Sequence, residues 1–289
     1  MTPDALSALR LDARKCAGHL RLSLRERSWQ GTQGNWAGAG TGSSIDFQDH
    51  RPYMPGDDPR YIDWAAYARS GQTIMKLYRE EVSPRVDLVL DVSRSMFFDP
   101  AKAEQNLRLF FFCMESALSI AAALKVFVIR GSELQLIPVE QAMDPAWEPE
   151  TAQSTETIPG LEQIPFRPNS MRLLISDLLY DVPPDPLLSV LTAQKGNGVI
   201  FAPFLEKEQN PDWSGNMELL DCETGRSRRQ RVDGGLLQRY RMAYARHLQS
   251  WQESSRRYQV RMSRIPSEKD LATALESEGL PQGVVETWG

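Results

Sequence analysis

Hydrophobic residues recur along this chain with two spacings, one typical of helices and one typical of strands. The helical spacing predicts amphipathic helices that begin near Thr2, Asp99, Asp185, Gly235 and Ser267. We expect the first helix to end near Arg25 and the fourth near Arg257. Short apolar runs predict strands over residues 74–78, 86–90, 124–129, 134–139, 171–175, 199–204 and 258–262, and a hairpin over 217–221 and 230–232. This order predicts an α/β domain of three layers, in which helices flank a mostly parallel sheet.

Composition excludes several classes of function. The 289 residues include 33 Lys and Arg against 38 Asp and Glu, and the net charge of −5 argues against a nucleic-acid-binding surface. Three distant cysteines, Cys16, Cys113 and Cys222, have no zinc-site spacing and suggest a reducing compartment. The most apolar stretch, residues 107–129, contains charged residues, and the N-terminus lacks a signal-peptide pattern. We therefore expect a cytoplasmic protein without a membrane span.

Oxygen-bearing side chains follow two of the predicted strands. Asp91, Ser93 and Ser95 come at every second position after one apolar run, and Asp177 follows another. If these runs are the first and fourth strands of an open parallel sheet, Asp91 and Asp177 meet at the crevice where the winding order reverses. Carboxylate and hydroxyl oxygens suit a hard cation that keeps some water, which means Mg²⁺ or Mn²⁺. The D-x-S-x-S spacing alone also fits an ordinary serine-rich turn.

Residues 43–82 combine both charge signs with aromatic side chains around the turn signal Pro55-Gly56. The charged residues are Arg51, Asp57, Asp58, Arg60, Asp63 and Arg69, and the aromatic residues are Tyr53, Tyr61, Trp64 and Tyr67. A catalytic cluster and a salt-bridge network both fit this composition, and we favour a network that clamps the turn. The five glycines within residues 31–42 are not followed by the lysine of a phosphate-binding loop, so they predict a flexible connector.

Two motifs resemble known families. Asp91, Ser93 and Ser95 are similar to the start of the metal-ion-dependent adhesion site of von Willebrand factor type A domains. The preceding segment, followed by D-V-S-R-S-M, more closely resembles the bacterial family called domain of unknown function 58. The residues that carry this resemblance are Asp46, Phe47, Arg51, Tyr53, Pro55, Gly56, Asp57, Asp58, Arg60, Ile62, Asp63, Trp64, Ala68 and Arg69.

The resemblance implies a von Willebrand factor type A-like, Rossmann-like domain over residues 84–289. Residues 1–83 would form a helical and β extension that packs on this domain. Ser93 and Ser95 would hold Mg²⁺ or Mn²⁺ directly, and Asp91 and Asp177 would hold it through water, with one position left open. Type A domains usually add a Thr from a second loop, and no threonine of the irregular segment (Thr151, Thr155, Thr157) matches that place.

The expected function is protein binding rather than catalysis. The family is often associated with MoxR-type AAA+ ATPases, so the resemblance implies such an ATPase as a partner in the assembly or maturation of protein complexes. A substrate protein would offer a Glu or Asp to the metal ion. A metal-dependent phosphohydrolase is an alternative, but haloacid-dehalogenase-type phosphatases need D-x-D, and Ser93 cannot act as that general acid. A scaffold with an empty metal site is a further alternative.

Overall fold

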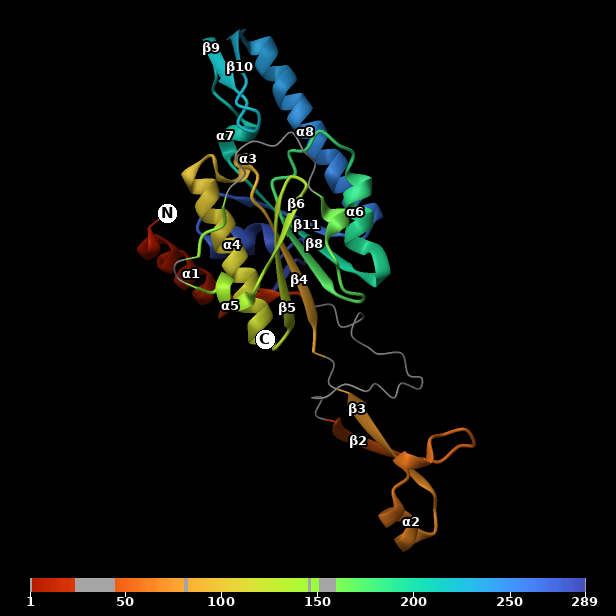
Figure 1. Cartoon of the computed structure of the whole chain (residues 1–289). Helices are drawn as coiled ribbons and strands as arrows, with labels where there is room; N and C mark the ends of the chain where they lie inside the picture. Colours follow the sequence, from red (N-terminus) through yellow and green to blue (C-terminus); the bar gives the residue numbers. More distant parts are fainter. Residues whose placement is uncertain (1, 24–44, 81–82, 145–146, 151–159, 289) are drawn as a thin grey trace. The chain divides into compact units, whose positions relative to one another are not determined.

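The computed structural model describes residues 2–23, 45–80, 83–144, 147–150 and 160–288 (Figure 1). The expected connector at 31–42 and the threonines of the irregular segment lie outside these residues. The chain forms two compact units, Trp29–Ser83 and Met1–Ser28 with Pro84–Gly289, which we call the small unit and the main unit. The division differs from the expected boundary after residue 83, because the first helix belongs to the main unit.

The main unit is built on a six-stranded sheet with the strand order β11-β8-β7-β4-β5-β6. Its strands are β4 (Arg85–Asp91), β5 (Ala123–Arg130), β6 (Glu133–Ile137), β7 (Met171–Ile175), β8 (Asn197–Phe204) and β11 (Arg261–Pro266). β6 is antiparallel to β5, and every other pairing is parallel. Counted along the chain, the first strand of this sheet pairs with the second and the fourth. The winding order therefore reverses between β4 and β7.

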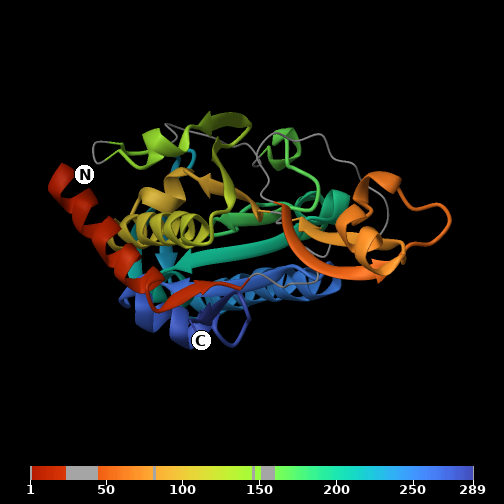
Figure 2. The ribbon, with the colours of Figure 1, turned by 90° about the horizontal axis from the view of Figure 1, so that it is seen from below.

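Helices cover both faces of this sheet, which confirms the expected α/β architecture (Figures 1 and 2). On one face, α1 (Pro3–Ala17) packs against α4 (Pro100–Ser119) in a core that includes Leu88 and Leu90. On the other face, α6 (Pro184–Thr192) and α8 (Gly234–Arg257) enclose a core that includes Val89. Successive residues of β4 thus enter different cores, as the alternation of a strand requires.

The first predicted helix ends earlier than expected. The N–H of Gly18 closes the last turn on the carbonyl of Arg14, and residues 20–22 form strand β1 (Leu20–Leu22). β1 pairs antiparallel with β12 (Val285–Thr287). The prediction to Arg25 was wrong because Leu20, which is buried in the strand, also continues the helical spacing of the apolar residues before it.

Three other predicted boundaries also need correction. The strand predicted over 258–262 begins at Arg261, because Gln259 has a left-handed φ of 58° after the end of α8. Val139, expected at the end of a strand, begins α5 (Val139–Ala142). The last helix begins at Leu271 rather than near Ser267, because the side chain of Asp270 accepts from the N–H of Thr273.

The remaining elements of the main unit are short. They are α3 (Arg94–Phe97), η3 (Leu161–Gln163), η4 (Ala193–Lys195), α7 (Glu206–Gln209), α9 (Leu271–Ala274), η5 (Leu275–Gly279) and the predicted hairpin, observed as β9 (Gly215–Leu220) and β10 (Ser227–Val232). In the small unit, β2 (Ile45–Pro52) pairs antiparallel with β3 (Ile74–Glu80), and η2 (Pro59–Tyr61) and α2 (Trp64–Ser70) lie between them in the chain. Across the described ranges, no helix has both the length and the apolar character that crossing a membrane requires.

Candidate functional site

Asp91 and Asp177 lie at the carboxyl ends of neighbouring parallel strands, at the point where the winding order reverses. Asp91 is the last residue of β4, and Asp177 comes two residues after the end of β7. Both are buried. This placement confirms that the two strands are the first and fourth of the sheet. Open α/β sheets bind ligands in the crevice at such a point.

Both oxygens of the Asp91 carboxylate accept hydrogen bonds. Its Oδ1 accepts from the backbone N–H of Ser93 at 2.9 Å, and its Oδ2 accepts from the hydroxyl of Ser176 at 2.9 Å and from the hydroxyl of Tyr180. Burial, and then the charge of Asp177, raise the pKa of Asp91 to about 6, although the three hydrogen bonds act in the opposite direction.

Ser93 and Ser95 bring two hydroxyl groups to the same place. Their Oγ atoms lie 3.2 Å apart. Ser93 stands at the N-cap position of α3, but its side chain makes no capping hydrogen bond. The Ser93 hydroxyl therefore makes no hydrogen bond to the backbone N–H groups of the helix that follows it.

A lysine that the sequence reading missed shares this site. Lys102, on α4, is fully buried, and its Nζ lies 2.8 Å from both Asp177 Oδ2 and Glu208 Oε1. Burial alone would lower the pKa of Lys102, but these two carboxylates raise it above its ordinary value. Lys102 therefore stays charged and supplies a fixed positive charge beside Asp177. Nothing in the sequence marks it, since its position in the helix stripe suggests an ordinary surface residue.

The backbone after Asp177 is held in an unusual conformation. Leu178 is buried and has a φ of 61°, in the left-handed region that a branched side chain rarely adopts. The carbonyl of Leu178 lies 2.7 Å from Nε2 of His247 on α8, and the N–H of Leu179 donates to Asp177 Oδ1 at 3.1 Å. A side chain of α8 and a hydrogen bond within the loop thus fix the segment that presents Asp177.

A carboxylate from elsewhere in the chain also reaches the serine loop. Glu223, in the turn between β9 and β10, accepts from the N–H of Ser95 at 2.7 Å and from the N–H of Arg94 at 3.3 Å. The turn is shaped by Asp221, whose carboxylate accepts from the N–H of Glu223 at 2.9 Å and from the hydroxyl of Thr224 at 2.8 Å. The sequence reading identified this hairpin but gave Glu223 no role.

The motif residues of the small unit form ion pairs around a turn. The guanidinium of Arg51 donates to both oxygens of Asp57 at 2.7 Å, and Asp57 also accepts from the N–H of Met54 at 2.8 Å. Arg51 and the Met54 N–H hold the pKa of Asp57 below its ordinary value. The ion pair and the backbone hydrogen bond hold the turn together, as expected for a salt-bridge network rather than a catalytic cluster.

The other motif residues have different surroundings. Asp58 pairs with Arg60 at 2.6 Å, and Asp63 caps α2 by accepting from the N–H of Ala66 at 3.0 Å. Trp64 has 62% of its surface exposed. Tyr53 is half-buried, Pro55, Gly56 and Arg69 are exposed, and all belong to the small unit.

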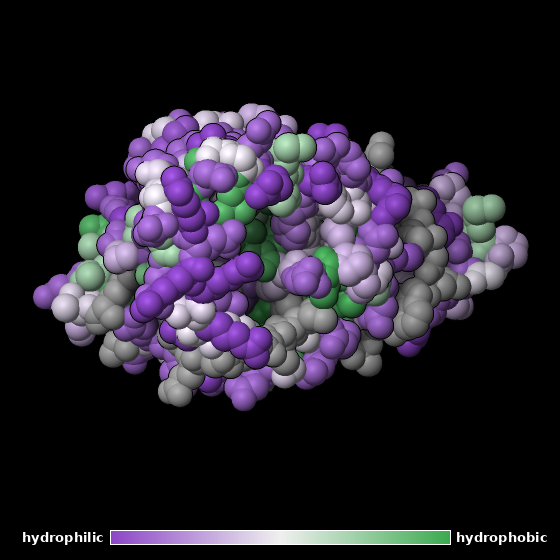
Figure 3. Space-filling view, turned by 90° about the horizontal axis from the view of Figure 1, so that it is seen from above, coloured by the Kyte–Doolittle hydropathy of each residue, from purple (hydrophilic) through white to green (hydrophobic). Residues whose placement is uncertain are grey.

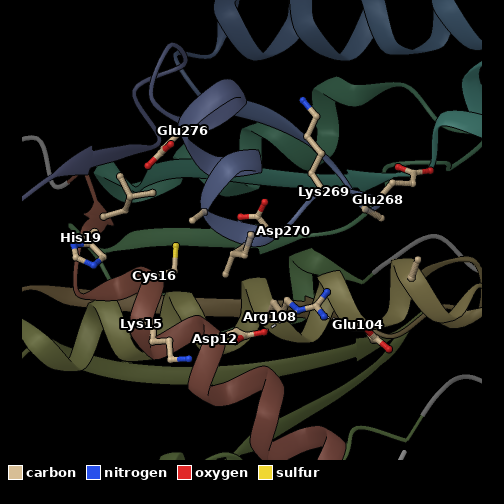
Figure 4. Close-up of a pocket in the computed structure, with 15 residues that line it drawn as sticks. Asp12, Lys15, Cys16, His19, Glu104, Arg108, Glu268, Lys269, Asp270 and Glu276 are labelled. Carbon is tan, nitrogen blue, oxygen red and sulfur yellow. Dashed lines mark hydrogen bonds and ion pairs between the residues drawn. The ribbon is translucent and has the colours of Figure 1, made fainter.

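The main unit also contains a cavity away from the strand ends. It has a volume of about 580 Å³ and lies between α1, α4 and α9 (Figure 4). Its charged lining includes Asp12 and Glu104, which lie 3.9 Å and 2.9 Å from the guanidinium of Arg108. None of the strand-end residues lines this cavity. Its mixture of charges favours no particular ligand.

At the strand ends, the atoms best placed to bind a metal ion are the hydroxyl oxygens of Ser93 and Ser95. Within the described ranges, the structure contains no group of three or more His, Cys, Asp and Glu side chains arranged for a metal ion. Two ligands on adjacent corners of a magnesium octahedron lie about 3 Å apart. The Ser93 and Ser95 hydroxyls are hydrogen-bonded to each other, and the 3.2 Å between their oxygens is close to this spacing. The spacing of the hydroxyl pair therefore fits Mg²⁺, and Asp91 and Asp177 lie at the ends of the two neighbouring strands.

One of the comparisons with known proteins supports the resemblance to domain of unknown function 58. The solved structure of the conserved hypothetical protein BatB from Bacteroides thetaiotaomicron is 10% identical, with a TM-score of 0.33, over 69% of this chain and 98% of that chain. A TM-score of this size does not establish a shared fold. No curated protein matches the chain. The family model described as protein of unknown function DUF58 matches residues 49–254, which is more than half of the chain, and the protein therefore belongs to this family.

Proposed function

We propose that this protein is a metal-ion-dependent protein-binding module of the von Willebrand factor type A kind. The observation that carries the proposal is the pair of serine hydroxyls, 3.2 Å apart, beside two buried carboxylates at the reversal point of the sheet. A bound Mg²⁺ or Mn²⁺ would supply an electrophilic centre for a partner's carboxylate. The strand order supports the type A comparison, since it is the doubly wound order with one antiparallel edge strand.

The side chains at this site would have different roles in binding a cation. Ser93 and Ser95 would offer neutral oxygens as direct ligands, which would leave the charge of a bound cation largely uncompensated. Asp91 orients the serine loop through the N–H of Ser93, because both of its oxygens are already engaged in hydrogen bonds. Asp177, paired with Lys102, contributes less net negative charge than a free carboxylate would. An acidic side chain from a partner would supply the remaining ligand of a bound cation.

The partner that we propose is a MoxR-type AAA+ ATPase, with which the protein would act in the assembly or maturation of complexes. This part of the proposal rests on membership of the family. The chain would have no catalytic activity of its own, and we propose a cytoplasmic location. A phosphohydrolase gains no support from the strand ends, because Ser93 stands where such an enzyme requires an acid.

One observation favours a second candidate, a scaffold that binds no metal. The ammonium of Lys102 already neutralises Asp177 and Glu208, as a cation would. If this charge alone satisfies the site, the serine hydroxyls need no metal ion. The two candidates differ in their response to divalent cations.

Co-purification tests the proposed function. The tagged protein and the MoxR-type ATPase of the same bacterium should be retained together in Mg²⁺ and separate in EDTA. The double variant Ser93→Ala with Ser95→Ala should lose the ATPase in both buffers. Retention that is equal in Mg²⁺ and EDTA, for wild type and double variant alike, would refute a metal-dependent interaction.

A further inference from the structure

We propose that the loop of Ser93–Ser95 and the β9–β10 hairpin together bind an acidic protein segment, one carboxylate of which displaces Glu223. This inference rests on the proposed function, and it names the chemistry of the partner and the internal group that competes with it. It assigns Glu223 as the chain's own occupant of the place that a partner's carboxylate would take.

The structure already shows a carboxylate at this loop. Both oxygens of Glu223 accept hydrogen bonds from the loop, at 2.7 Å from the N–H of Ser95 and 3.3 Å from the N–H of Arg94. Ser95 also bears one of the two hydroxyls of the proposed metal site. The backbone beside the proposed metal site thus already receives a carboxylate, and Glu223 supplies it.

The hairpin that carries Glu223 presents positive charge to solvent. Arg228, Arg229 and Arg231 are all exposed on β10, in a protein whose net charge is −5. Arg229 lies 3.9 Å from Glu218, and both side chains are more than half exposed, so water weakens this pair. Figure 3 looks onto the side of the main unit from which the hairpin extends in Figure 1 and shows a mostly hydrophilic surface around a hollow in which hydrophobic residues are visible. The exposed arginines of β10 favour an acidic segment over a neutral one.

The hairpin is only lightly anchored, which allows displacement. A two-stranded hairpin has little stability of its own. On one face of β9, Met217 and Leu219 are half-buried, whereas Asn216, Glu218 and Leu220 on the other face are exposed. Hydrogen bonds to Glu223 join the tip of the hairpin to the loop, so their loss would release the tip without opening either core of the main unit.

The test measures binding of a fluorescein-labelled peptide of alternating Glu and Gly by anisotropy, with the Gln version of the peptide as the control ligand. Glu223→Gln should bind the Glu peptide in Mg²⁺ more tightly than wild type, by about fivefold or more. Glu223→Asp keeps the charge but shortens the side chain, and it should show a gain in the same direction. Glu218→Gln removes a charge from the same hairpin without touching the loop and should gain less than Glu223→Gln. Arg229→Gln with Arg231→Gln should weaken binding.

Several results would overturn the inference. They are equal affinity of wild type and both Glu223 variants, an equal gain from Glu218→Gln, equal binding of the Gln peptide, or no binding of the Glu peptide to any variant. Circular dichroism and melting of each variant show that a change in affinity does not come from unfolding. If the Glu223 variants gain affinity equally in Mg²⁺ and EDTA, and wild type binds no Mn²⁺, displacement stands and the proposed metal role fails. If Mn²⁺ binds but no Glu223 variant gains affinity, the metal role stands and displacement fails.

Discussion

Lys102 Nζ lies 2.8 Å from Asp177 Oδ2, and both side chains are buried at the carboxyl edge of the sheet. Lys102→Met would leave Asp177 without its buried partner, and Glu208 would also lose one. Breaking a buried ion pair from one side costs about 3–5 kcal/mol, so we expect a loss of unfolding free energy of this size in EDTA. Denaturation by urea measures it.

The matched control for this prediction is Lys207→Met. Lys207 pairs with Asp99, but its side chain is 64% exposed, so its removal should cost less than about 1 kcal/mol. If a divalent cation binds beside Asp177, Mg²⁺ should restore part of the stability of Lys102→Met and none of that of Lys207→Met. Equal losses in the two variants would contradict the buried arrangement.

Asp91→Asn separates a role in metal binding from a role in the fold. The folded state raises the pKa of Asp91 to about 6, so the ionised group opposes folding, increasingly between about pH 4 and pH 6 and constantly above that range. Asn keeps one oxygen for the N–H of Ser93, and its amide can donate to the hydroxyls of Ser176 and Tyr180. At pH 8 in EDTA we therefore expect the variant to melt at or above the temperature of wild type.

In excess Mg²⁺ the order should reverse, because a ligand stabilises the state that binds it and the variant binds it poorly. Thermal melts of both proteins in both buffers measure these effects. An Asp91→Asn protein that melts well below wild type in EDTA would show that this carboxylate serves the fold, as a structural cap costs about 1 kcal/mol when removed.

Cys222 reports on the turn that contains Glu223. Cys222 is half-buried. Burial and, to a smaller extent, the charge of Glu223 raise the pKa of its thiol. Because the thiolate is the reactive form, the raised pKa slows reaction with a disulfide reagent. We expect Glu223→Gln to speed the labelling of Cys222, because the turn is released and a nearby negative charge is removed. Absorbance after addition of the reagent follows the rate. Cys16 and Cys113 are buried and should stay unlabelled in the native protein. No change in rate would show that Glu223 does not hold the turn.

We expect the packing of α1 on the main unit to contribute to the free energy of unfolding. Leu6 is 2% exposed against the core shared with α4, so Leu6→Ala should lower the unfolding free energy by about 2–5 kcal/mol. Leu11, on the same helix, is 53% exposed, and Leu11→Ala should change it by less than about 0.5 kcal/mol. Urea denaturation of the two variants compares them. Equal effects would contradict the packing of α1 on α4.

Local patterns were sufficient to predict the sheet and the meeting of Asp91 with Asp177. Buried parallel strands are continuous apolar runs, and the carboxyl ends of neighbouring parallel strands share one edge, so the placement of both residues follows from strand order. The end of α1 was not predictable in this way, because Leu20 continues the helix stripe although Leu20 and Leu22 belong to a strand. Their pairing partner, Val285–Thr287, lies at the other end of the chain.

Each group that the sequence did not reveal contacts a residue that lies far from it along the chain. Lys102 lies on a helix, Tyr180 in a loop and Glu223 in a hairpin turn, and each reaches the strand ends only through the fold. No spacing relates them to the D-x-S-x-S motif. Ser176 had a detectable signal, since it directly precedes Asp177 at the end of a predicted strand.

Titration calorimetry with Mn²⁺ tests most directly whether the serine pair holds a metal ion. We expect wild type to bind Mn²⁺ and to release heat that EDTA abolishes, whereas Ser93→Ala with Ser95→Ala should release none. A double variant of two exposed serines on other helices, Ser119→Ala with Ser189→Ala, should behave as wild type. Equal heats for wild type and the Ser93 and Ser95 double variant would contradict the proposed metal site.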